Sequence, residues 1–442
     1  MRLLLIIFDG LGDRPAPELD GRTPLEAAVT PNLDRFAAEG ISGLLHAKSP
    51  GYALGSPLAL HLMFGYPEAE FPDRGPLLAR ARGVEVDPGA VALAARFARA
   101  TVREGELTLT ERFIRDREQQ CAALAESIAS YEAGGFEFRY HYHGRGDGLL
   151  IVRGASPEVT DTDPLALNLP VLRARARAEA ADASLAARTA EALNEYLRWA
   201  HGRLSAHPSA CVEDGDEPVN ALITKWAGVP NAYEPFVERW GMRPASLPDE
   251  EVVTGLMLVL GFDVEQVDAA GPADDLRRRL ELARRRLDEG FEFVHLHSKY
   301  PDPISHENDP QGSVQAIEEL DAAMDVYWDR FGDDRDVVTV LTTDHSTPSV
   351  WEGWPRGRFF DQHGGEPGPI TIRGGNVRVD DVAVSGERPA AGGGLGQLRG
   401  EDFMPVLLNA AERTNMWEMR PTPVRRPYRP RPDDLEALKI GR

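Results

Sequence analysis

Three short apolar runs, each followed by acidic residues or histidines, are the feature that most constrains the fold of this chain. The runs are residues 3–8, 291–296 and 337–341, and they lead respectively to Asp9, to Asp302 and His306, and to Asp344 and His345. Short buried strands that carry such side chains at their carboxyl ends are typical of an open α/β sheet with its functional site at that edge. The sequence therefore predicts an α/β fold with helices on both faces of a core sheet.

The residue types at these strand ends are those of metal ligands. Carboxylate oxygens and imidazole nitrogens suit Mn²⁺, Mg²⁺ or Zn²⁺, and no cysteine takes part. The spacing of Asp302 and His306 allows one helical turn or a tight loop to aim both side chains at one ion. Asp344 and His345 are adjacent, so they serve either the same ion through a turn or two different roles. Any one of these pairs alone is more often a turn or a helix cap, so the pattern has weight only as a set.

Further motifs follow one another along most of the chain. They are the segments 23–28 (TPLEAA), 30–34 (TPNLD), 55–56 (GS), 64–67 (FGYP), 74–77 (RGPL), 159–164 (VTDTDP), 297–306 (HSKYPDPISH), 344–348 (DHSTP) and 363–367 (HGGEP). In this order, from residue 1 to about residue 409, the chain resembles the alkaline phosphatase superfamily. More narrowly, it resembles the archaeal-type, cofactor-independent (2,3-bisphosphoglycerate-independent) phosphoglycerate mutases. The resemblance implies an alkaline-phosphatase-like core sheet with a smaller inserted α+β cap domain.

The resemblance also implies a role for each candidate ligand. One divalent ion would be held by Asp302, His306 and His363, and a second by Asp9, Asp344, His345 and the hydroxyl of Ser56. Mn²⁺ is the favoured metal, with Zn²⁺ or Mg²⁺ as alternatives. Ser56 would accept the phosphoryl group, because a bound cation lowers the pKa of a serine hydroxyl and two ions hold the attacking and leaving oxygens in line. The alternative reading of Ser56 is a helix N-cap after Gly55, and the two readings are compatible, because a helix N-terminus also favours a phosphorylated side chain.

The chain departs from the family pattern near the expected substrate. Pro57 follows the nucleophile where members have aspartate, and Pro303 follows the first ligand where they have glutamate. Lys225 and Trp226 stand where an Arg-Gly pair is usual. Arginine grips phosphate or carboxylate with a planar fork that lysine does not reproduce. The predicted metal ligands are therefore intact, whereas the specificity pocket is altered.

Charge limits the partners of this chain. The net charge of −22 argues against binding to nucleic acid or to anionic membranes. An anionic substrate must therefore be attracted by local cations, and we expect the substrate contacts to be Arg74, Lys225 and Lys299 together with the metals. The predicted partner is a small phosphorylated metabolite. A homo-oligomer is possible, but no feature of the sequence requires one.

Cysteine use and hydropathy predict a cytoplasmic enzyme. Cys121 and Cys211 are too few for a disulfide framework and fit a reducing compartment. The apolar start at residues 3–8 is too short for a signal-peptide core. No apolar stretch approaches the roughly 20 residues that a membrane-spanning helix needs.

The positions of the ligands predict how the chain is divided. Because Asp9 and Ser56 lie far in sequence from the other five ligands, the chain must leave the core domain and return to it. We predict a first core segment at 1–75, an inserted cap at 76–212, a second core segment at 213–415 and a Pro/Arg-rich arm at 416–442. In the cap we expect strands at 136–143 and 149–152, then a helix at about 172–204. The acidic turn at 213–218 is a plausible hinge.

Two classes of enzyme fit these features. The leading hypothesis is metal-dependent phosphotransfer through a phosphoserine, interconverting 3-phosphoglycerate and 2-phosphoglycerate in glycolysis. The alternative is a phosphatase, or a phosphomutase or transferase, acting on another phosphorylated or phosphonate metabolite, which Pro57, Lys225 and Trp226 favour. A degenerate binding protein is the least favoured reading, because the ligand set is complete.

Overall fold

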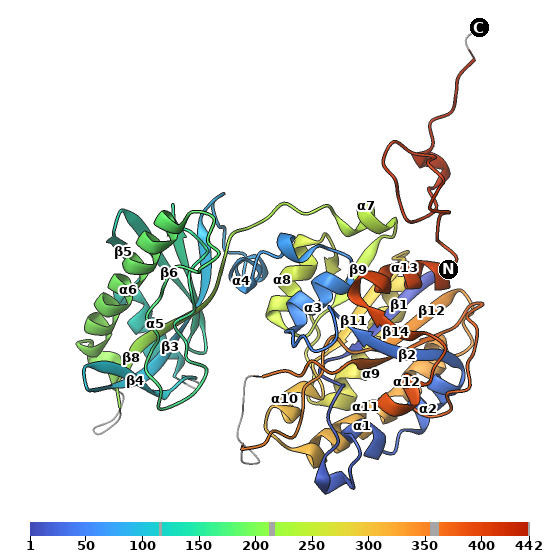
Figure 1. The fold of residues 1–442 in the computed structure, drawn as a ribbon, viewed down its shortest axis with the longest axis horizontal. Helices are drawn as coiled ribbons and strands as arrows, with labels where there is room; N and C mark the ends of the chain where they lie inside the picture. Colours follow the sequence, from blue (N-terminus) through green and yellow to red (C-terminus); the bar gives the residue numbers. More distant parts are fainter. Residues whose placement is uncertain (115–116, 212–216, 354–361, 441–442) are drawn as a thin grey trace. The chain divides into compact units, whose positions relative to one another are not determined.

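The computed structural model describes residues 1–114, 117–211, 217–353 and 362–440 (Figure 1). The chain forms two compact units. The core unit combines both ends of the chain, Met1–Phe71 and Tyr233–Arg442, and the inserted unit is Pro72–Ala232. Each unit has its own sheet and its own hydrophobic core.

Within the described residues, the core unit is built around one eight-stranded sheet. In order across the sheet, the strands are β10 (Asp263–Val264), β9 (Pro244–Leu247), β11 (Phe293–Ser298), β1 (Arg2–Phe8), β12 (Val337–Thr342), β13 (Gly368–Arg373), β2 (Gly40–His46) and β14 (Gly396–Arg399). The central run β9–β11–β1–β12 is parallel, whereas β13 is antiparallel to both of its neighbours. β11 and β12 are buried along their whole length, which is what a parallel sheet covered on both faces requires.

Helices cover both faces of this sheet. Alternate residues of β1, beginning at Leu4, pack in one cluster with α2 (Pro31–Ala38), α9 (Pro272–Asp288) and α11 (Pro310–Phe331). On the other face, Phe64 at the end of α3 (Ser56–Met63) contacts Phe293 and His295 of β11. The remaining core helices are α1 (Pro24–Ala27), α7 (Phe236–Trp240), α8 (Glu251–Val259), α10 (Asp302–Ser305), α12 (Glu387–Ala391) and α13 (Gly400–Ala410). The predicted α/β class is confirmed.

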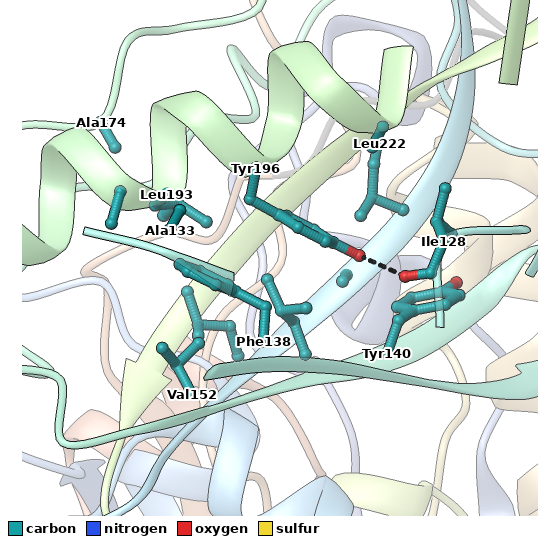
Figure 2. Close-up of a cluster of buried hydrophobic side chains, with 14 of the residues drawn as sticks. Ile128, Ala133, Phe138, Tyr140, Val152, Ala174, Leu193, Tyr196 and Leu222 are labelled. Carbon is teal, nitrogen blue, oxygen red and sulfur yellow. Dashed lines mark hydrogen bonds between the residues drawn. The ribbon is translucent and has the colours of Figure 1, made fainter. Parts of the chain in front are cut away.

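The inserted unit is an antiparallel sheet with helices. Its strands lie in the order β4 (Glu106–Glu111), β3 (Val91–Arg103), β7 (Asp147–Arg153), β6 (Phe136–Gly144) and β5 (Ser130–Ala133), and β8 (Val219–Gly228) also pairs with β3. Its helices are α4 (Arg74–Ala81), α5 (Glu118–Ser127) and α6 (Ala183–Ser205). Figure 2 shows part of its core, in which Tyr196 of α6 stacks on Phe138 of β6 with ring centroids 5.0 Å apart.

The limits of the inserted unit differ from those predicted. It extends to Ala232 instead of residue 212, because β8 is hydrogen-bonded to β3. At its other end it begins at Pro72 instead of residue 76, so that Arg74 and the rest of α4 belong to it. Of the acidic turn predicted as a hinge, residues 213–216 lie outside the described residues.

The long helix of the insert was predicted to begin too early. α6 begins at Ala183 and not at about residue 172, because the Asp182 side chain accepts a hydrogen bond from the backbone N–H of Leu185 and caps the helix there. Before this cap, the backbone of Ala174 is hydrogen-bonded to a side chain and not within a helix: its N–H donates to Asn194 Oδ1, and its C=O accepts from Asn194 Nδ2.

Part of the C-terminal arm contacts the core unit, whereas residues 432–440 are exposed. Tyr428 forms an isolated bridge with Thr414 and donates its hydroxyl to the carbonyl of Glu238 at 3.2 Å. Arg426 pairs with Glu234 at 2.6 Å. Among the residues that the structure describes, no helix is both long and apolar enough to cross a membrane.

The buried hydroxyl of Tyr196 offers a test of the insert core. It donates to the carbonyl of Ile128 at 3.1 Å, so Tyr196→Phe should cost about 1 kcal/mol, since a buried acceptor is left unpaired. Native-state hydrogen exchange of the α6 amides measures this loss. Tyr131→Phe is the matched control, because that hydroxyl bonds the exposed Glu195 and its removal should change little. Equal losses in the two variants would contradict this description of the core.

Candidate metal centre

Three neighbouring parallel strands deliver the acidic residues to one edge of the core sheet. Ile7 of β1 pairs with Thr342 of β12, so Asp9 and Asp344 each follow two residues further on. On the other side of β1, β11 leads to Asp302, whose backbone N–H donates to the carbonyl of Asp9 at 3.1 Å. Because parallel strands end at the same edge, the three carboxylates converge there, and all three residues are buried.

One group of ligand atoms surrounds Asp302. His306 follows it by one helical turn, and its Nε2 lies 3.3 Å from Asp302 Oδ1. His363 Nε2 lies 3.8 Å from the same oxygen and 3.2 Å from His306 Nε2. His363 Nδ1 lies 2.6 Å from the carbonyl oxygen of Leu54 and must donate its proton to it, which leaves Nε2 with a free lone pair.

A second group surrounds His345. Its Nε2 lies 3.1 Å from Asp9 Oδ1, 3.6 Å from Asp344 Oδ2 and 3.1 Å from Ser56 Oγ. The structure therefore brings all seven predicted ligands into two adjoining groups, which meet where the rings of His345 and His363 stack at 3.8 Å.

Ser56 is placed at the first turn of α3 without capping it. The N-cap is Gly55, so the alternative reading of Ser56 as the cap is wrong, and the serine hydroxyl points to His345. Pro57 takes the second helical position, where a missing N–H costs no intrahelical bond. The departure from the family pattern at Pro57 is thus compatible with the helix.

The carboxylates and histidines of this site strongly shift one another's pKa values. Burial, and then the charges of Asp344 and Asp302, raise the pKa of Asp9 well above its usual value. Burial alone would also raise the pKa of Asp302, but the hydrogen bond and charge of His306 bring it below the ordinary value. Burial and the nearby His345 lower the pKa of His363 to about 3, so this ring is neutral at neutral pH.

The unpaired oxygens of this site fit divalent cations. Both carboxylate oxygens of Asp9 and Oδ2 of Asp344 are buried without a hydrogen-bond partner among the described residues. Buried carboxylates left unpaired beside like charges are costly, and a cation offsets that cost. The oxygen and imidazole donors are those that Mn²⁺, Mg²⁺ and Zn²⁺ accept.

Sequence reasoning assigned no role to Thr347, although it lies in a segment that was singled out. Its hydroxyl donates to Asp302 Oδ1 at 2.6 Å and lies 3.1 Å from His345 Nδ1. Because the single hydroxyl hydrogen goes to Asp302, Thr347 accepts from His345 Nδ1–H, and His345 keeps the lone pair on Nε2. Thr347 thus orients a ligand of each group.

Of the three predicted substrate contacts, two belong to the inserted unit and one to the core unit. Arg74 and Lys225 belong to the inserted unit, where both lie over the ring of Trp226, at 4.4 and 4.2 Å from its centroid. Lys225 also pairs with the buried Asp163 at 3.4 Å. Lys299 belongs to the core unit, at the end of β11, with its amine 3.9 Å from Asp249 and its side chain 42% exposed.

Comparisons with known proteins show the family of this chain. The model of a family described as the metalloenzyme superfamily matches residues 1–410. Over 421 residues, covering 93% of this chain and 97% of the relative, the chain is 36% identical to a 2,3-bisphosphoglycerate-independent phosphoglycerate mutase of Methanopyrus kandleri. It is 34% identical to another such enzyme of Methanothermobacter thermautotrophicus, covering 92% of this chain and 98% of that one.

Two solved structures are also similar to this chain over nearly its whole length. A protein of Pyrococcus horikoshii superposes with a TM-score of 0.75 at 28% identity, covering 95% of this chain and 99% of that one. A cofactor-independent phosphoglycerate mutase from Thermoplasma acidophilum superposes with a TM-score of 0.60 at 29% identity, covering 93% and 99% of the two chains.

Gly10 provides a test of how tightly this edge is built. Its φ is +67°, and an added Cβ would lie 2.6 Å from Thr347 Oγ1 and 2.9 Å from Asp302 Cβ. Gly10→Ala should therefore lower the free energy of unfolding of the metal-free protein by more than the roughly 1 kcal/mol expected for the backbone alone. Gly21→Ala is the control, because Gly21 has a φ of +71° and open space around it. Urea denaturation compares the two, and equal losses would show that the packing around Gly10 is loose.

Proposed function

This chain belongs to the metalloenzyme superfamily and, within it, to the 2,3-bisphosphoglycerate-independent phosphoglycerate mutases, and we propose on that basis that it interconverts 3-phosphoglycerate and 2-phosphoglycerate. The observation that carries this proposal is the position of the Ser56 hydroxyl beside six other candidate ligands, of which all but the half-buried His363 are buried. Glycolysis, and therefore the cytoplasm, is the setting that we propose for it.

We assign two divalent ions to the two groups of ligands. One would be held by Asp302, His306 and His363, and the other by Asp9, Ser56, Asp344 and His345. When bound, the ions would supply positive charge that lowers the pKa of the serine hydroxyl and offsets the charge of the transferring phosphoryl group. We propose Mn²⁺ for both, since hard oxygen donors and imidazole suit it.

Ser56 is the residue to which we assign the phosphoryl group. Its Oγ forms a bond to phosphorus while the bond from phosphorus to one glycerate oxygen breaks, and that oxygen gains the proton that Ser56 loses. The other glycerate hydroxyl then attacks the phosphoserine and returns the proton to Oγ. Backbone N–H groups at the start of α3 favour the phosphorylated side chain there. Water must be excluded between the two steps, because it would otherwise hydrolyse the phosphoserine.

Local cations are the groups that we propose for holding the substrate anions. They are Arg74, Lys225 and Lys299. Arg74 and Lys225 each lie over the same indole ring in the inserted unit, at 4.4 and 4.2 Å from its centroid, so both positive charges are near Trp226. Trp226, which carries this ring, has a φ of +59°, a backbone conformation that costs on the order of 1–3 kcal/mol in a residue other than glycine. Such backbone strain persists only where the surrounding structure enforces it. The strain at Trp226 therefore supports a functional role for Arg74 and Lys225, which lie over its ring.

The activity is tested by ³¹P NMR of purified protein with Mn²⁺ and 3-phosphoglycerate. The expected result is formation of 2-phosphoglycerate without free phosphate. Ser56→Ala should abolish turnover while the thermal midpoint changes little, because the hydroxyl does not cap α3. Release of free phosphate alone would make the protein a phosphatase, and near-normal turnover by Ser56→Ala would remove Ser56 from the mechanism.

A second test concerns the cations. Lys225→Met should raise KM for 3-phosphoglycerate by roughly 10- to 100-fold, since a hydrogen bond to a charged group is worth about 1.5–3 kcal/mol. Lys439→Met, in the exposed arm, removes the same charge and should leave KM unchanged. Steady-state kinetics with both variants separates a local contact from a change in net charge. An unchanged KM for Lys225→Met would exclude this lysine from substrate binding.

A further inference from the structure

His297 is a completely buried residue of β11 that lies beside the proposed metal ligands. It was part of a segment singled out in the sequence, but no role was assigned to it. Neither of its ring nitrogens has a hydrogen-bond partner within 1–114, 117–211, 217–353 and 362–440. A buried imidazole with both nitrogens unpaired is unfavourable, so a group that this ring serves is expected nearby.

That group is a pair of carboxylates. His297 Nε2 lies 3.5 Å from Asp344 Oδ2 and 3.9 Å from Asp9 Oδ2, and both oxygens lack a hydrogen-bond partner in the described structure. These three side chains form a cluster of their own in which the ligating atoms lie within 4.8 Å of one another. The first distance is at the outer limit of a hydrogen bond and the second exceeds it, so each carboxylate must move closer to Nε2 to accept its proton.

Asp9 lies between two histidines and presents one oxygen to each. Oδ1 faces His345 Nε2 at 3.1 Å, on the side where Ser56 lies, and Oδ2 faces His297. A carboxylate that holds a metal ion through one oxygen characteristically accepts a hydrogen bond elsewhere, which fixes its orientation. His297 is therefore placed to support Asp9 through the oxygen that does not face His345, and it also lies beside Oδ2 of Asp344.

The two ring nitrogens also distinguish His297 from His345 and His363. In those two, Nδ1–H is taken by Thr347 and by the Leu54 carbonyl, so Nε2 keeps the lone pair that a metal ligand needs. No such acceptor fixes a proton on Nδ1 of His297 among the described residues. Its proton can therefore occupy Nε2, the nitrogen that faces the two carboxylates.

From this geometry we propose that His297 is a positioning residue, whose Nε2–H donates to Asp344 and Asp9 and so orients these two ligands of the second metal ion. The proposal rests on the two-metal site given under the proposed function. Loss of a partner of this kind typically lowers metal affinity by about 10- to 100-fold.

The test measures Mn²⁺ binding to the full chain by equilibrium dialysis and metal analysis, without substrate. His297→Met removes the donor and keeps an apolar side chain of similar length, whereas His297→Gln restores an N–H near the position of Nε2. His295→Met is the matched control: His295 is equally buried on the same strand and face, and its Nδ1 bonds Ser246 Oγ at 2.9 Å. The thermal midpoint of each metal-free variant reports any loss of packing.

We expect wild type to bind two Mn²⁺ ions, His297→Met to bind one of them about 10- to 100-fold more weakly, and His297→Gln to regain most of that affinity. His295→Met should bind both ions as wild type does. The proposal is overturned if His297→Met binds as wild type, if His297→Gln is as weak as His297→Met, or if His295→Met loses as much. Binding of fewer than two ions by wild type would instead overturn the two-metal site itself.

Discussion

The mutual repulsion of three buried carboxylates is the constraint on which the rest of this structure depends. Asp9, Asp302 and Asp344 follow three adjacent parallel strands, so the sheet itself forces them to one edge. Unpaired charges in such a place would oppose folding, and divalent cations are what the arrangement can accommodate. The turn at Gly10 and the hydroxyl of Thr347 help to hold this arrangement, because both contact Asp302 closely and fix its distance from its neighbours.

The order of the ligands along the chain explains its division into two units. β1 and α3 supply Asp9 and Ser56 before the chain leaves the core, and β11, β12 and the segment that leads to β13 supply the others after it returns. The inserted unit is held by its own core around Phe138 and Tyr196, so its surface residues can vary without disturbing the metal ligands. The change from Arg-Gly to Lys225-Trp226 lies in this unit.

Much of the core and its site could be predicted from the sequence because the signals are local. Apolar runs that stop at acidic residues give β1 and β12 directly, and the resemblance to a family supplies the partners that lie far apart in the chain. The end of β11 was harder to locate. It runs two residues further than the apolar run, because His297 and Ser298 are fully buried in the strand although they are polar. The same polarity hides the part that His297 plays beside Asp344, which only the pairing of β11 with β1 reveals. The extent of the insert likewise depends on pairing between distant residues, whereas the start of α6 follows from a local cap, Asp182, that the sequence analysis missed.

The most direct test of this account is an anomalous difference map from crystals of the protein grown with Mn²⁺. The account predicts two peaks about 4 Å apart, one among Asp302, His306 and His363 and the other among Asp9, Ser56, Asp344 and His345. A single peak, or peaks away from these side chains, would contradict the assignment of a two-metal phosphotransfer site.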